Sequence, residues 1–299
     1  MVIWWRNFIE PSFLILHCLE VCALYMKLKD GKSKVLTFSY DDCVIQDSRL
    51  IDIFNANKLK ATFNINTGLY FPEDAQRQSL RGRMKLSEAK RLYSGSEHEV
   101  AVHGLTHLHL EKLQAPQVLM EILEDRQNIE SQYHTLARGM AYPYGTYSEE
   151  VITALKKCGI CYARGGVSTR EFEFPIEWLT IQPTCHHNDP KLMELAKHFV
   201  EDVTRGPSEN WLFYVWGHSY EFDNDDNWDV IEQFADYVSK REDVWYATNI
   251  EIYDYVKAYE RLQVSVDETI IHNPSTIDVW ISKNNQTYCV KAGERLVLM

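Results

Sequence analysis

The sequence has fewer basic than acidic residues, and this shortage limits the partners to be expected. Its 299 residues include 31 Lys and Arg against 43 Asp and Glu, which gives a formal net charge of -12. Nucleic acids and anionic membrane surfaces are held mainly by basic side chains. We therefore expect neither nucleic acid nor a membrane as the main partner, and a neutral or cationic substrate fits the charge.

The chain also lacks a cysteine framework. Its 7 cysteines are odd in number and scattered, which is typical of reduced intracellular proteins rather than of disulfide-linked secreted domains. Cys158 and Cys161 form a Cys-x-x-Cys, but they join a helix end to a strand, which favours two small buried residues over a redox pair. The thiols predict a cytoplasmic protein.

No apolar stretch is long enough to cross a membrane. The nearest candidate, residues 13–25, is interrupted by His17 and Glu20, and it is shorter than the roughly 20 residues that a spanning helix needs. It resembles a signal peptide only weakly, because it has little positive charge before it. Met26 stands just before the first strand, so we interpret residues 1–25 as an extension that adds nothing to the fold.

Strand and helix patterns alternate along most of the chain, without an internal repeat or linker. Expected strands are 34–39, 61–66, 99–102, 139–141, 161–163, 178–181, 211–215 and 244–247. Expected helices are 47–57, 87–95, 116–134, 148–158, 189–203, 227–240 and 248–262, the second and fourth capped by Ser87 and Ser148. About seven strand-and-helix units in roughly 230 residues favour a parallel α/β barrel over an open sheet.

The pattern changes after Leu262, where short strands and turns follow one another. This predicts a small β appendage over residues 263–299, following a barrel over residues 26–262. The sequence gives the appendage no recognisable chemistry.

Polar side chains follow the expected strands at six places. These are Asp41 and Asp42, His103 and His107, Tyr142 to Gly145, Arg164, His186 and His187, and His218. In a (β/α) barrel the reactive groups lie just past the carboxyl ends of the strands. We therefore expect all six loops to contribute to one active site.

Two of these places predict a metal site. Adjacent ionised carboxylates such as Asp41 and Asp42 repel each other unless a cation or a shared proton is present, although a helix cap beside a solvated Asp is the alternative. His103 and His107 are four residues apart, so on one helical turn they could bind one ion, or else serve as capping or core residues. With Asp42 they would form a His-His-Asp set with open positions, leaving Asp41 as a general base.

Four segments resemble the motifs of the polysaccharide deacetylases, the carbohydrate esterase family four or NodB homology domain. They are Thr37 to Asp42, His103 to His107, Tyr142 to Gly145, and Val215 to His218. The resemblance covers roughly residues 34–255. It implies a distorted (β/α)7 barrel and one divalent ion, usually Zn²⁺, with Co²⁺, Ni²⁺ or Mn²⁺ as alternatives.

The resemblance also implies roles for individual residues. Asp41 would be the base, His218 the acid that protonates the leaving amine, and the backbone N–H of Tyr144 the oxyanion donor. The metal ligands would be Asp42, His103 and His107, and the substrate contacts Tyr142, Pro143, Trp216, His186 and His187.

The chain departs from the family pattern at two positions. Cys43 stands where a glycine usually follows the Asp pair, and Ala141 stands where the third motif usually has an arginine. A base beside a metal-bound carboxylate needs a cation to keep it ionised. We predict that Arg164, just past the neighbouring strand, pairs with Asp41, the alternative being a loop cap or a contact to a substrate carboxylate.

These observations predict a metal-dependent hydrolase that removes an acetyl group from an N-acetylated sugar or a related small amide. Two alternatives stay open: hydrolysis of a non-sugar amide, as in the ring-opening amidohydrolase branch, and a non-catalytic carbohydrate-binding domain. Aromatic residues near the rim could stack on a sugar or simply roof the barrel; they are Trp178, Tyr220, Phe222 and Trp228.

Overall fold

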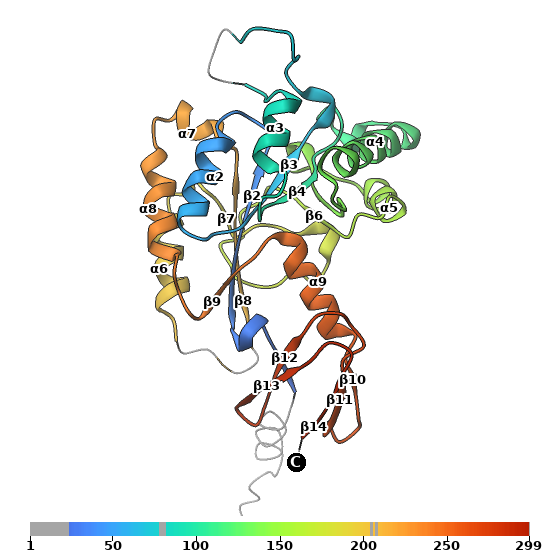
Figure 1. Cartoon of the computed structure of the whole chain (residues 1–299), viewed down its shortest axis with the longest axis vertical. Helices are drawn as coiled ribbons and strands as arrows, with labels where there is room; N and C mark the ends of the chain where they lie inside the picture. The colour runs from blue at the N-terminus through green and yellow to red at the C-terminus, as the bar shows by residue number, and fades with distance from the viewer. Residues whose placement is uncertain (1–23, 78–81, 204–205, 207–208, 299) are drawn as a thin grey trace, which may run out of the picture. The chain divides into compact units, whose positions relative to one another are not determined.

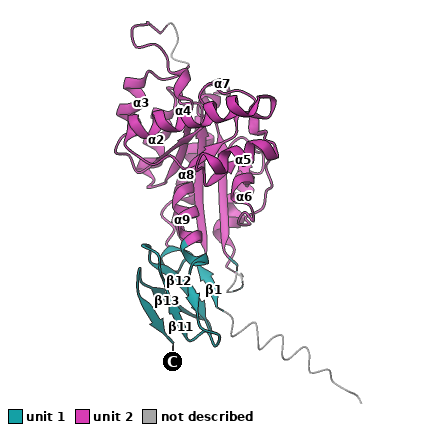
Figure 2. Ribbon diagram, turned by 90° about the vertical axis from the view of Figure 1, so that its right-hand side faces the viewer, with its two compact units in different colours: residues 1–32, 205–209, 258–299 teal, residues 33–204, 210–257 magenta. Residues whose placement is uncertain are grey.

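The computed structural model describes residues 24–77, 82–203, 206 and 209–298, so the expectation for residues 1–23 lies outside the described part. The chain divides into two compact units (Figure 2). The described residues of the larger unit lie within 33–203 and 210–257, and those of the smaller unit are 24–32, 206, 209 and 258–298. Within the described ranges, every helix is too short or too polar to cross a bilayer.

A curled parallel sheet forms the centre of the larger unit (Figure 1). Its order is β6-β5-β4-β3-β2-β8-β7, with β9 also paired to β2. The strands are β2 (Lys34–Asp41), β3 (Ala61–Ile65), β4 (Glu99–Val102), β5 (Gly139–Ala141), β6 (Tyr162–Arg164), β7 (Cys185–His186), β8 (Trp211–Gly217) and β9 (Val244–Tyr246). This arrangement confirms the expected distorted (β/α) barrel.

Helices lie around this sheet (Figure 1). They are α2 (Asp47–Ala56), α3 (Leu86–Tyr93), α4 (Ala115–Tyr133), α5 (Glu149–Lys157), α6 (Leu192–Glu201), α7 (Tyr220–Asn224), α8 (Trp228–Val238) and α9 (Asn249–Glu260). Short 3₁₀ turns are η1 (Lys29–Gly31), η2 (Thr67–Leu69), η3 (Leu110–Lys112), η4 (Pro143–Gly145) and η5 (Trp178–Thr180). Strand β2 is buried along its whole length, as expected for a parallel strand with both faces covered.

The helix start expected at Ser87 was wrong. Helix α3 begins one residue earlier, and Glu88 accepts a hydrogen bond from the backbone N–H of Lys85 at 2.8 Å. The hydroxyl and N–H of Ser87 instead donate to Glu73, so the serine satisfies a distant carboxylate. Ser148 does cap α5, because its hydroxyl accepts the N–H of Val151.

Two further expectations failed between β6 and β8. Residues 178–180 form the turn η5, and the strand of this region is β7, which holds His186. Helix α6 begins at Leu192 rather than at Asp189, because the Asp189 carboxylate accepts the N–H of Lys191 at 2.9 Å and makes a separate turn.

The smaller unit contains two three-stranded antiparallel sheets, in agreement with a β-rich segment. One is β1 (Tyr25–Lys27), β12 (Val279–Lys283) and β13 (Gln286–Val290); the other is β10 (Gln263–Val264), β11 (Ile270–His272) and β14 (Arg295–Val297). Its buried core includes Ile271, Val279, Ile281 and Val290. Strand β1 was not expected, since three residues carry too little pattern, and it places residues 25–27 in this unit.

Candidate active site

The carboxyl end of β2 delivers two carboxylates into the barrel. Asp41 is the last residue of the strand, and the chain then leaves through two left-handed residues, Asp42 (φ 89°) and Cys43 (φ 55°). Such a conformation is strained for a residue with a Cβ, which explains why glycine suits the position that Cys43 occupies. The turn moves the Asp42 carboxylate away from the strand axis and towards the loop after β4.

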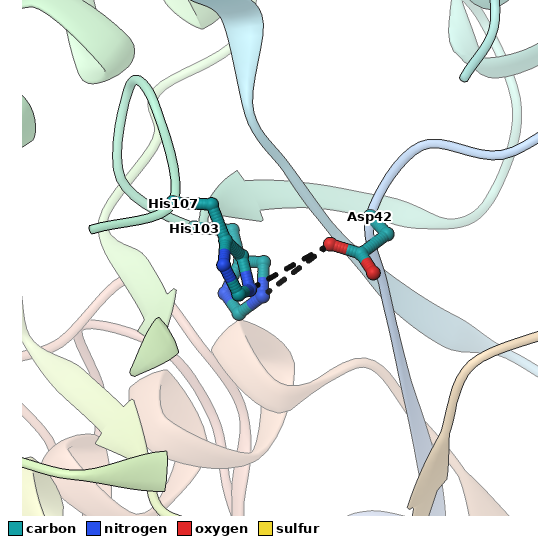
Figure 3. A group of neighbouring side chains, drawn as sticks. All are labelled: Asp42, His103 and His107. Atoms are coloured by element: carbon teal, nitrogen blue, oxygen red, sulfur yellow. Dashed lines mark ion pairs between the residues drawn. The ribbon is translucent and has the colours of Figure 1, made fainter. Parts of the chain in front are cut away.

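His103 and His107 come together, but not on a helix. The chain turns through Gly104 (φ 75°) and His107 itself (φ 57°), so the expected helical turn was wrong. The two imidazole centroids lie 4.8 Å apart, and both rings face Asp42 (Figure 3). The Nε2 atoms of His103 and His107 are 3.9 and 3.8 Å from Oδ1 of Asp42.

These three side chains fit a divalent ion. Nδ1 of His103 lies 2.8 Å from the carbonyl oxygen of Ala141, which can only accept, so Nδ1 carries the proton and Nε2 has a free lone pair. That Nε2 is buried without a hydrogen-bond partner. Burial lowers the pKa of His103 to about 4 and also lowers that of His107, which keeps both rings neutral. The three donor atoms lie within 4.8 Å of one another, and neutral imidazoles with a carboxylate suit zinc.

Asp41 is held by Arg164, as predicted. Nη2 of the arginine lies 2.6 and 2.5 Å from the two carboxylate oxygens, and Asn64 donates a further bond of 2.8 Å. Burial alone would raise the pKa of Asp41, but the charge and hydrogen bonds of Arg164, together with His103 and His218, outweigh it and lower the pKa to about 2. Arg164 is the last residue of β6 rather than the first beyond it, and its guanidinium packs 4.5 Å from the centre of the Trp216 ring.

His218 faces both carboxylates from the end of β8. Its Nε2 is 4.0 Å from an oxygen of Asp41 and 4.0 Å from an oxygen of Asp42. Its Nδ1 is 3.4 Å from Oε2 of Glu221, the same oxygen that lies 3.1 Å from His186 and 3.3 Å from His187. Burial would lower the pKa of His218, but the bond to Glu221 and the nearby aspartates raise it.

His186, His218 and Glu221 also have donor atoms within 4.8 Å of one another, so we considered them as a second metal site. Nδ1 of His186 accepts the backbone N–H of Asn188 at 3.1 Å. A neutral imidazole that accepts at Nδ1 carries its proton on Nε2, which therefore donates to Glu221. This tautomer favours a hydrogen-bonded cluster over metal ligation.

Three residues that the sequence predicted as substrate contacts have buried side chains. Tyr142 is 1% exposed and donates to the carbonyl of Leu179, and His187 is 0% exposed between the rings of Tyr40 and Phe222. Pro143 is buried as well. As placed, the side chains of Tyr142, Pro143 and His187 thus support the site rather than face a substrate.

Tyr144 is 58% exposed and has a left-handed backbone (φ 60°). Its ring stacks on His109 at 3.7 Å between centroids and lies 4.6 Å from that of His107. Of the four aromatic residues named from the sequence, Trp178, Phe222 and Trp228 are buried, which supports the roof over the stacking role.

Four residues of the site were missed from the sequence: Asn64, Asn66, Arg83 and Glu221. Only Glu221 had a local signal, because it follows His218 by three residues. Arg83 contacts Asp42 from the segment before α3, where nothing in the sequence pattern marks it.

The curled (β/α) barrel thus collects ionised carboxylates and neutral imidazoles at the carboxyl ends of its strands. The sequence model of the polysaccharide deacetylase family matches residues 28–163, so this segment of the chain is similar to that family. The match includes Asp41, Asp42, His103 and His107. It ends before Arg164 and His218, whose assignment depends on the geometry above.

One solved structure has a similar fold, and two others match with lower TM-scores. A Mycobacterium smegmatis protein assigned to the polysaccharide deacetylases has a TM-score of 0.54 and 16% identity, covering 80% of this chain and 95% of that one. The Streptococcus pyogenes deacetylase PplD, in complex with acetate, has a TM-score of 0.41 and 18% identity. The match covers 48% of this chain and 61% of that one. A carbohydrate esterase family 4 pseudoenzyme from Bacillus anthracis has a TM-score of 0.46 and 16% identity, covering 77% and 68%.

Proposed function

We propose that the protein is a metal-dependent deacetylase that removes the acetyl group from an N-acetylated sugar. The observation that carries this proposal is the position of Asp41. It is kept ionised by Arg164, and its Oδ2 lies 3.9 Å from Nε2 of His103, beside the three candidate ligands but outside their set. A base separate from the ligand set is what hydrolysis of an amide by activated water needs.

A divalent ion bound by Asp42, His103 and His107 would supply Lewis-acid polarisation of water and of the acyl oxygen. Asp41 then accepts the proton of the attacking water, because Arg164 keeps it available as a carboxylate at neutral pH. The backbone N–H of Tyr144, on the exposed turn η4 beside His107, donates to the developing oxyanion.

His218 protonates the leaving amine in this proposal. Oε2 of Glu221 pairs with Nδ1 of His218 at 3.4 Å and accepts the backbone N–H of His218 at 3.0 Å, so Nε2 is the nitrogen directed towards the two aspartates and the reacting amide. The same carboxylate raises the pKa of His218 against the opposing effect of burial, which favours the protonated imidazole. Glu221 therefore positions the acid and supports its charge.

Side chains around this centre support a sugar as the substrate. The exposed Tyr144 ring and the partly buried His109 ring stack within 10° of parallel, and the outer face of this stack is flat and lies near His107. Flat aromatic surfaces bind the apolar faces of sugar rings through packing contacts. Trp216 and His186, both partly exposed, would contact the other side of the acetyl group.

We also propose that the protein is located in the cytoplasm. Five described cysteines are free thiols, namely Cys43, Cys158, Cys161, Cys185 and Cys289. Fractionation of the producing cells tests it: recovery of the protein outside the cytoplasm would contradict it.

The proposal is tested by metal content and acetate release. The purified protein should bind one Zn²⁺ per chain, His103→Ala should lose it, and only the parent should release acetate from N-acetylglucosamine oligomers. Hydrolysis of cyclic amides without acetate release would favour the non-sugar amidohydrolase. Zinc binding without either activity would favour a non-catalytic carbohydrate-binding domain, and equal zinc content in His103→Ala would overturn the ligand set.

A further inference from the structure

We propose that Arg83 and Asn66 form a clamp that holds the two metal-ligand loops in register. The inference rests on the proposed function, because it assigns these residues to the positioning of Asp42, His103 and His107. Neither residue belongs to the motifs found in the sequence. Their contacts connect the loop after β2 to the loop after β4 through the end of β3.

Arg83 holds both the side chain and the backbone of Asp42. Its Nη2 lies 2.9 Å from Oδ1, the carboxylate oxygen that faces His103 and His107, and its Nη1 donates to the Asp42 carbonyl oxygen. Asp42 has a left-handed backbone, so its carboxylate direction depends on contacts that keep this turn in place. The forked guanidinium provides two such contacts at once.

Asn66 connects this arginine to the histidine loop. Its Oδ1 accepts from Nη1 of Arg83 at 2.6 Å, and its Nδ2 donates to the carbonyl oxygens of His103 and Gly104 at 2.6 and 2.7 Å. A guanidinium can only donate and a carbonyl can only accept, so this amide orientation is the one that satisfies all three partners. Asn66 is 1% exposed, and water cannot replace these bonds.

The position of Asn66 suits this task. It follows β3, which lies between β2 and β4 in the sheet, so it stands between the strands that deliver Asp42 and His103. Ring orientation at His103 is set separately by the Ala141 carbonyl. The clamp therefore sets the spacing between the two loops rather than the tautomer of a ligand.

The positive charge of Arg83 affects metal affinity in the opposite direction to the clamp, and the experiment must distinguish the two effects. A guanidinium beside Asp42 repels a bound cation, so an arginine that acted only through its charge would weaken metal binding. A clamp strengthens it, because ligands held in place lose less freedom when the ion binds. Removal of Arg83 changes the affinity in opposite directions in the two cases.

The test is the Zn²⁺ affinity of the metal-free full-length protein, measured by competition with a chromogenic chelator. Arg83→Met, Arg83→Lys and Asn66→Ala should each bind Zn²⁺ about 10- to 100-fold more weakly. Arg49→Met is the matched control, since Arg49 pairs with Glu232 on the surface and should bind like the parent. The double variant Arg83→Met with Asn66→Ala should lose little more Zn²⁺ affinity than whichever single variant binds Zn²⁺ more weakly, because the two residues act as one unit.

Thermal unfolding without metal shows which variants are folded. If Arg83→Met does not fold, Arg83→Lys still tests the clamp, because it keeps the positive charge and much of the side-chain length. Parent-like affinity in Arg83→Lys, tighter binding in Arg83→Met, or additive losses in the double variant would each overturn the clamp. Zinc binding that His103→Ala abolishes but the clamp variants retain would defeat only this inference. Parent protein without zinc affinity would defeat the proposed function itself.

Discussion

Replacement of Arg164 by methionine is the sharpest test of the site, because it removes a buried charge and keeps most of the bulk. Arg164 is 1% exposed and donates to both oxygens of Asp41, to the Gly165 carbonyl and to the Ser39 hydroxyl. Methionine replaces none of these bonds. Asp41 would keep only Asn64 as a donor among the contacts described.

The size of the effect follows from the pKa of Asp41. Arg164, with smaller contributions from His103 and His218, lowers this pKa from 3.8 to about 2, which corresponds to about 2–3 kcal/mol at about 1.4 kcal/mol per pKa unit. A carboxylate whose pKa is lower in the folded than in the unfolded state stabilises the fold at pH values above its unfolded pKa. This contribution is lost as the pH falls towards 2. Without Arg164 burial dominates and the pKa of Asp41 rises, so we expect a loss of about 3–5 kcal/mol in the free energy of unfolding at pH 7.

The assay is the pH dependence of kcat/KM, with zinc content and urea unfolding measured in parallel. Arg164→Met should retain zinc, lose about 100-fold or more in turnover, and show its acid limb at higher pH, since Asp41 must still lose its proton to act. Arg138→Met is the control: Arg138 pairs with Asp254, but both are about one-third exposed, so about 0–1 kcal/mol is expected. An acid limb at the parent position, with near-normal turnover, would refute the role of Arg164.

Three further substitutions test single roles. Asp41→Asn should keep zinc but lose about 10²–10⁴-fold in turnover, and retained activity would remove Asp41 as the base. His218→Ala should lose more activity on an amide than on an activated ester, because only the amine needs a proton to leave, and equal losses would exclude the acid role. Glu221→Gln should move the basic limb of kcat/KM to lower pH, since this carboxylate raises the pKa of His218, and an unmoved limb would contradict the pairing.

The sequence by itself determined the elements and their direction. Alternating periods of strand and helix gave the parallel barrel, and the carboxyl end of each strand then indicated which polar residues meet. This reasoning was sufficient for Asp41, Asp42, His103 and His107, and also for the Arg164 pair, because neighbouring strands in a barrel have neighbouring ends. It failed where a local pattern was too short, as in β1, or where another carboxylate competed for a cap, as at Ser87.

Only the tertiary structure decided which side chains support the site. Arg83 contacts Asp42 across 41 residues and Arg164 reaches Ser39 across 125, and no spacing rule relates such positions. The same applies to burial: Tyr142 belongs to a motif, and His187 to a loop, that was expected at the site, yet both side chains are buried in the core. Local patterns record the backbone path of one segment, whereas the partners of a buried polar group depend on which other loops fill the space around it.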